Sequence, residues 1–146
     1  MSRGPTGARA LAGSLLRAGG PANGVVANVV LAAAAAAIVV SAVVHLHLWM
    51  TGYKHIPTIG PLFLLQVIAG FAIAAVLLVF RRGWAIVLAF GFVLSTIAGF
   101  LLVVYVGLFG FTDTWAAPFA RMAFAYEVAA LVLLAFGGSL CYLRSD

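Results

Sequence analysis

Long apolar runs alternate with short polar or glycine-rich and proline-rich segments along the chain. Four runs are long enough to cross a bilayer, at about residues 24–50, 61–80, 84–108 and 123–143. A helix rises about 1.5 Å per residue and the hydrocarbon core of a bilayer is about 30 Å thick, so about 20 apolar residues suffice. The pattern predicts an all-α polytopic membrane protein, folded as a bundle of four transmembrane helices.

Composition excludes a soluble binding module. Of the 146 residues, 66% are hydrophobic and 8% are charged, and the mean hydropathy is +1.23. Soluble domains average about 25% charged residues. The net charge of +5 does not indicate nucleic acid, because the arginines flank apolar runs and do not cluster on a polar face. We expect a lipid bilayer as the main environment and no nucleic-acid partner.

The cations divide unevenly between the two sides of the predicted bundle. Residues 1–23 form a basic segment without acids, expected to be a flexible cytoplasmic tail. The apolar run that follows is too long for a cleaved signal peptide. Two cations lie in the opposite loops, Lys54 and Arg121, and six lie on the side of the termini: Arg3, Arg9, Arg17, Arg81, Arg82 and Arg144. The positive-inside rule then predicts both termini in the cytoplasm and loops 51–60 and 109–122 outside.

Small residues recur at helical spacing in three of the runs. The first contains six consecutive alanines, Ala32 to Ala37, and the second has Gly70 and Ala74 four residues apart. In the third run, Gly91, Ser95 and Gly99 repeat every fourth residue. Such positions permit close packing of helices in a membrane. Each of the three patterns therefore permits close approach by another helix.

Polar residues of the predicted helices concentrate in one layer. At about 1.5 Å per residue, this layer lies about 5–8 Å below the outer boundary. Trp49 and Tyr53 lie where an outer aromatic belt would be. With the adjoining loop, the layer supplies the candidate ligand or interaction residues: His45, His47, Trp49, Tyr53, Lys54, His55, Gln66, Tyr105, Arg121 and Glu127.

Glu127 is the one carboxylate inside a predicted span. A charge at that depth costs a few kcal/mol, so such a residue faces the bundle interior and is paired or protonated. Its candidate partners are His45, His47, Lys54 and Arg121. Two interpretations remain open: a proton, cation or ligand site, or one half of a buried ion pair that fixes helix register.

The histidines indicate a metal or haem site only weakly. His45 and His47 are two residues apart, about 200° around a helix, so they cannot both face one interior metal. We expect one to face the bundle and the other to face outward. A bis-histidine haem needs a second helix with a histidine, and the alternative, His55, would have to fold back from the loop. His47 and Met50 could offer an imidazole and a thioether to copper. No cofactor is expected; haem, copper and quinone remain alternatives.

A resemblance rests on the run from His45 to Gln66, HLHLWMTGYKHIPTIGPLFLLQ. It resembles a signature, HLxLWxxGYxxIPTIGPLFLLQ, of small, mostly uncharacterised four-span membrane proteins of actinobacteria. The GLFGF segment at 107–111 fits the same layout. The resemblance implies a multi-pass protein of the bacterial inner membrane whose defining feature is this outward-facing stretch. It implies no biochemical activity.

Two classes of function are compatible with the pattern. The first is a non-enzymatic accessory or assembly subunit of a larger inner-membrane complex, or a homo-oligomer, with an outward-facing interaction surface. The second is a redox or transport element that binds a haem, metal, quinone or proton in the outer polar layer. An enzyme is not expected, because the serines of the spans have no base at a recognisable spacing.

Overall fold

The computed structural model describes residues 24–143 as four long helices. A short 3₁₀ helix, η1 (Tyr53–His55), links the first two. The four are α2 (Val25–Thr51), α3 (Ile59–Phe80), α4 (Gly83–Tyr105) and α5 (Ala120–Leu143). All four are long and apolar enough to cross a membrane. The predicted all-α bundle of a multi-pass membrane protein is confirmed; the basic segment 1–23 and Arg144 lie outside the described residues.

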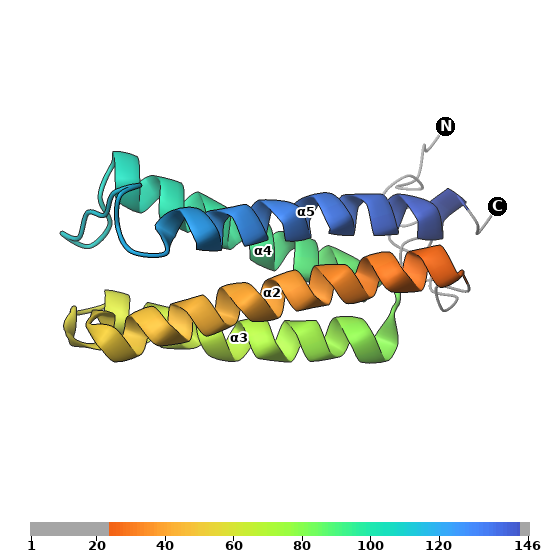
Figure 1. Ribbon diagram of the computed structural model, residues 1–146, viewed down its shortest axis with the longest axis horizontal. Helices are drawn as coiled ribbons and strands as arrows, with labels where there is room; N and C mark the ends of the chain where they lie inside the picture. The colour runs from red at the N-terminus through yellow and green to blue at the C-terminus, as the bar shows by residue number, and fades with distance from the viewer. Residues whose placement is uncertain (1–23, 144–146) are drawn as a thin grey trace, which may run out of the picture.

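The helices form a ring in which each packs against its neighbours in the chain, and α5 returns to pack against α2 (Figure 1). The most extensive contacts are those of α2 with α3 and α5, and the least extensive are those between α3 and α4. The start of α2 and the end of α5 lie at one end of the bundle. The connections 52–58 and 106–119 lie at the other, which we call the loop end.

The helix boundaries differ from the prediction mainly at the loop end. Helix α3 begins two residues early, so Pro61 lies in its first turn, where its missing N–H costs nothing. Helix α4 stops at Tyr105, before a tight turn in which Leu108 and Phe111 exchange backbone hydrogen bonds of 2.8 and 2.9 Å. Helix α5 begins at Ala120, three residues before the predicted start.

Two of the three small-residue patterns face neighbouring helices. Half of the alanine run is buried: Ala34, Ala35 and Ala37. A Cβ on Gly70 would lie 3.0 Å from the Cβ of Ala42, so α3 approaches α2 closely there. The close approach that Gly70 and Ala74 permit is therefore used, since Ala74 is also buried.

The third pattern does not face a helix of this chain. Gly91 and Ser95 are exposed, and a Cβ on Gly91 or Gly99 would meet nothing within 4 Å. Within residues 24–143, the close approach that this spacing permits is therefore not used. The reason is that α4 turns a different stripe to the core, formed by Ala85, Ile86, Ala89, Val93 and Ile97.

Candidate functional site

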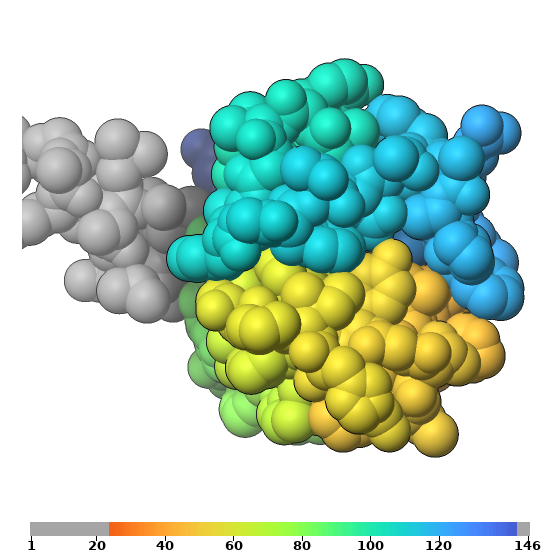
Figure 2. Space-filling view, turned by 90° about the vertical axis from the view of Figure 1, so that its left-hand side faces the viewer, coloured from red at the N-terminus to blue at the C-terminus, as the bar shows by residue number. Residues whose placement is uncertain are grey.

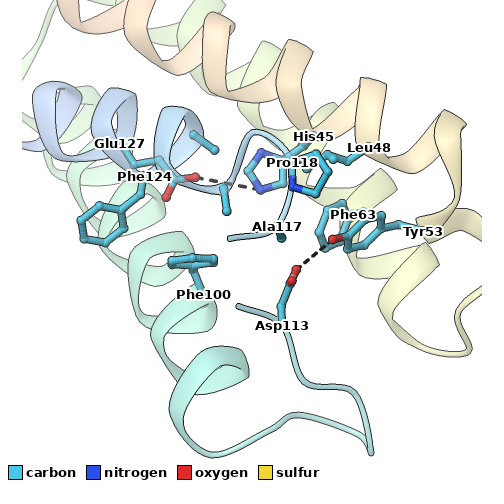
Figure 3. Close-up of a pocket in the computed structure, with 12 residues that line it drawn as sticks. His45, Leu48, Tyr53, Phe63, Phe100, Asp113, Ala117, Pro118, Phe124 and Glu127 are labelled. Carbon is cyan, nitrogen blue, oxygen red and sulfur yellow. Dashed lines mark hydrogen bonds and ion pairs between the residues drawn. The ribbon is translucent and has the colours of Figure 1, made fainter. Parts of the chain in front are cut away.

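The site centres on Glu127, on the side of α5 that faces the core. Buried residues recur along this side at Ala123, Glu127, Ala130 and Leu134, so the carboxylate occupies a core position. Only 4% of Glu127 is exposed. The hydroxyl of Ser41 on α2 donates a hydrogen bond of 2.9 Å to its Oε1. His45 Nε2 lies 4.0 Å from the same oxygen (Figure 3).

The ring of His45 has a definite orientation towards Glu127. Its Nδ1 lies 2.8 Å from the carbonyl oxygen of Ser41. A carbonyl oxygen only accepts, so Nδ1 carries the proton and donates it. In the neutral ring, Nε2 is then an unprotonated lone pair aimed at the carboxyl group of Glu127. The pair can therefore hold one further proton, on the imidazole or on the carboxyl.

A small cavity of about 40 Å³ adjoins Glu127 and His45 and extends towards the loop end. Phe63, Phe100 and Phe124 form much of its apolar wall (Figure 3). This volume exceeds the space that one water molecule needs, and the polar groups at both of its ends are suitable partners for one. The cavity thus offers room for a water molecule between the buried pair and the outer groups.

Tyr53 and Asp113 close the cavity at the loop end. The hydroxyl of Tyr53 donates a hydrogen bond of 2.8 Å to Asp113 Oδ2 (Figure 3). The ring of Tyr53 stacks on Phe63 at a centroid distance of 4.7 Å. Burial, together with the hydrogen bond to Asp113 and the charge of this carboxylate, raises the pKa of Tyr53 well above its usual value. The phenol therefore stays protonated and keeps the closure intact at neutral pH.

The same contact joins the two loops of this end. Figure 2 looks directly onto the loop end, where the residues around 50–60 (yellow) and those around 105–115 (teal) meet across the face. Tyr53 also packs edge-on against Phe111, with centroids 5.8 Å apart. The loops therefore cover the polar layer, and the cavity lies beneath their junction.

The predicted site residues separate into those that reach this layer and those that do not. His45 and Tyr53 line the cavity, and Gln66 lines a small void on the other side of Glu127. His47 is exposed, with its ring edge-on to Phe119 at 5.2 Å. The expectation that one histidine of the pair faces the bundle and the other faces outward is confirmed.

The remaining candidates lie on the surface of the loop end. Lys54 and His55 are exposed, and Arg121 donates to the carbonyl oxygen of Trp115 at 3.2 Å. Tyr105 is 71% exposed and accepts a hydrogen bond of 3.2 Å from the indole of Trp115. Trp49 is half-buried. Of the candidate partners of Glu127, therefore, only His45 faces it; the interpretations with His47, Lys54 and Arg121 are wrong within the described residues.

A metal site has little support in this geometry. Residues 24–143 contain no group of three or more His, Cys, Asp or Glu side chains that could hold a metal ion. His47 and Met50, the candidate copper pair, are both exposed on the surface of α2. The site in the described residues is therefore a buried carboxyl group that faces an imidazole nitrogen at 4.0 Å.

Two polar residues of the site, Ser41 and Asp113, are not among the candidates predicted from the sequence. Ser41 lies four residues before His45, so the two share one face of α2, and this spacing is a signal that could have found it. Asp113 is the one acidic residue in the loops of the described chain. Its pairing with Tyr53, however, spans 60 residues and depends on how both loops fold.

No protein-family model, curated protein or solved structure matches this chain. The fold and the site define the class: a multi-pass membrane protein with a buried carboxyl–imidazole pair near one end of a four-helix bundle.

Proposed function

We propose that this protein is a non-enzymatic inner-membrane protein that reversibly binds a proton at Glu127 and His45. The observation that carries the proposal is the buried carboxyl group, which accepts from Ser41 and faces the Nε2 lone pair of His45. A charged carboxylate at this depth costs a few kcal/mol. Because neither Lys54 nor Arg121 neutralises it, a proton is the simplest counter-charge.

The proton site is reached from the loop end of the bundle. The cavity that adjoins Glu127 extends towards Tyr53 and Asp113. On the opposite side of Glu127, the core contains fully buried Leu31, Leu77 and Leu134. Among the described residues, Ser41 and Glu127 are the buried polar side chains. The arrangement supports a proton-linked binding or sensing site, and it opposes a path for protons across the membrane.

The orientation of the bundle belongs to the same proposal. The distribution of arginines supports cytoplasmic termini and an outward-facing loop end. The resemblance of residues 45–66 to small actinobacterial membrane proteins is consistent with a bacterial inner membrane. In this orientation, the proton site responds to the medium outside the cell.

Proton flux across liposomes tests the one-sided access. The protein is reconstituted with a pH-sensitive dye inside, and an outside pH jump is applied with valinomycin present to dissipate voltage. The account predicts the same slow leak for the wild type and Glu127→Gln. A flux that the wild type supports and Glu127→Gln abolishes would show a transmembrane path and contradict the proposal.

An accessory role in a larger complex is the second candidate, and one observation favours it. The exposed Gly91 and Ser95 of α4 leave room for close approach by a helix of another chain. Purification in a mild detergent, followed by mass spectrometry, should then recover a stoichiometric partner. The Gly91→Leu variant should lose it, and recovery of the wild type alone would count against this role.

A further inference from the structure

A second, larger cavity lies between α3 and α4 at the level of the polar layer. Its volume is about 440 Å³, and its walls include Leu62 and Leu65 of α3 and Phe92 and Val103 of α4. Leu65 is 60% exposed, so the cavity is a groove that is open on the side of α3 and α4 that faces lipid. His45 lines its inner wall, next to the proton site.

The groove exists because small residues face each other where α3 and α4 pack least extensively. Ala69 lies on one wall, and Ser95 and Gly99 lie on the other. A Cβ on Gly99 would meet nothing within 4 Å, so the space above it is unfilled by this chain. A volume of this size is typical of a site for a small organic molecule.

Gln66 gives the groove a polar end without an internal partner. Its side chain is half-buried and lines both the groove and the small void beside Glu127. It makes no hydrogen bond to any residue in 24–143. An amide without a partner is costly at membrane depth, because lipid tails cannot bond to it. Its amide thus presents both N–H donors and a carbonyl acceptor to an occupant.

The charge and shape of this end select among possible occupants. Asp113 is the charged side chain that lines the groove, and no lysine or arginine does so. A phosphate headgroup would therefore meet a like charge and no counter-charge. Four phenylalanine rings line the same region and favour stacking with a planar ring: Phe63, Phe92, Phe100 and Phe111.

From these observations we infer that the groove binds a neutral quinone-type amphiphile. A planar ring with carbonyl or hydroxyl oxygens occupies the end formed by Gln66 and His45, and the hydrocarbon tail runs between α3 and α4 into the lipid. The inference goes beyond proton binding at Glu127, which does not line the groove. It concerns binding alone and includes no electron transfer.

Binding of decylubiquinone to the full chain in phospholipid nanodiscs tests the inference. Trp115 packs on Phe100 of the groove at a centroid distance of 4.9 Å, so bound quinone should quench tryptophan fluorescence. Empty nanodiscs with a soluble tryptophan analogue correct for absorption by the quinone. We expect saturable quenching by one quinone per chain, and at least tenfold weaker binding in Gly99→Leu, which fills the groove. Gln66→Leu should also weaken binding several-fold, because it removes the amide.

Two matched variants distinguish this inference from general destabilisation and from the proton site. Gly91→Leu adds the same side chain to α4 where the space is also open, outside the groove, and should bind like the wild type. Glu127→Gln should also bind decylubiquinone like the wild type, even though this variant can no longer bind a proton at the carboxyl group. Quenching that never saturates, or that Gly99→Leu leaves unchanged, would show that the groove holds lipid chains only and would overturn the inference.

Discussion

Ser41 is the residue that holds the carboxyl group of Glu127 in place. Its hydroxyl crosses from α2 to α5, whereas Ser95 and Ser139 bond to carbonyl oxygens of their own helices, Phe92 and Ala135. A serine in a membrane helix commonly makes the second kind of bond. Apart from its four-residue spacing to His45, nothing in the sequence distinguishes Ser41 from the other serines.

Replacement of Ser41 by alanine should therefore be costly. The change leaves a buried carboxyl group without its hydrogen bond, which typically destabilises a protein by about 1–3 kcal/mol. The matched control is Ser139→Ala, at an exposed serine of α5, for which we expect less than about 0.5 kcal/mol. Reversible unfolding in mixed detergent micelles measures both. Equal losses for the two variants would contradict the assigned role of Ser41.

Tyr53 should make stability depend on pH only under alkaline conditions. The pKa of Tyr53 is raised in the folded protein. Its contribution to the free energy of unfolding is therefore fully present below the ordinary tyrosine pKa of about 10. It decreases as pH rises from that value through the higher folded pKa, because the unfolded chain loses the phenolic proton first. Melting temperatures between pH 8 and pH 11 should therefore fall more steeply for the wild type than for Tyr53→Phe. Parallel curves would show that the closure contributes nothing.

At the scale of the helices, packing depends on where small residues face a neighbour. A Cβ on Gly137 would lie 2.9 Å from Cδ2 of the fully buried Leu31, so α5 packs closely against α2 there. The adjacent Gly138 differs, since its Cβ would meet Ile86 at an ordinary 3.5 Å. The two glycines thus form a matched pair within one turn of α5.

Alanine substitutions at these two positions should have opposite effects. Gly137→Ala forces Leu31 to move in a packed core, and overpacking of this kind costs about 1–3 kcal/mol. Gly138→Ala gains helix propensity without a clash and should stabilise by up to about 1 kcal/mol. The same unfolding assay measures both variants. Stabilisation by Gly137→Ala would show that α2 and α5 are not in close contact at this point.

The number and approximate positions of the helices followed from the sequence, because the length of an apolar run is a sufficient signal in a membrane protein. The sequence was a poorer guide to which side of each helix faces the core. Helix α4 is apolar all round and carries two small-residue stripes, one through Ala85 and Ala89 and one through Gly91 and Ser95. No hydrophobic face marks the inner one. The sequence therefore does not tell which of the two stripes faces the core.

The part of the site that lies within the membrane helices could be predicted from the sequence. His45 and Glu127 were found because charged or ionisable groups are rare at membrane depth. Asp113 was missed because its position depends on the chain after α4, which turns through residues with positive φ: Gly107, Phe109 and Gly110. Phe109, with φ of 54°, is a residue type that seldom signals such a turn.

At the scale of the whole molecule, the two ends of the bundle have different characters. The loop end carries the covered polar layer, and the other end has Arg81, which bonds to Asn28 at 3.2 Å between α3 and α2. The distribution of arginines predicts that this second end is cytoplasmic. Orientation therefore determines which compartment Glu127 and His45 would exchange protons with in the proposed function.

Single-cysteine labelling tests this orientation. In a Cys141→Ser background, Lys54→Cys places a thiol on the loop end and Arg82→Cys places one in the turn between α3 and α4; both positions are exposed. A membrane-impermeant maleimide applied to intact cells should label the first variant and spare the second until the cells are lysed. The reverse pattern would place the proton site on the cytoplasmic side.

The central claim is that Glu127 gains and loses a proton reversibly in the folded protein, with His45 of α2 and the Tyr53–Asp113 closure facing it. Infrared difference spectroscopy of the protein in lipid detects the C=O stretch of a protonated carboxyl group directly. The account predicts a band that grows on acidification, reverses on return to higher pH and is missing in Glu127→Gln. A wild-type spectrum that lacks the band, or in which it does not change with pH, would contradict it.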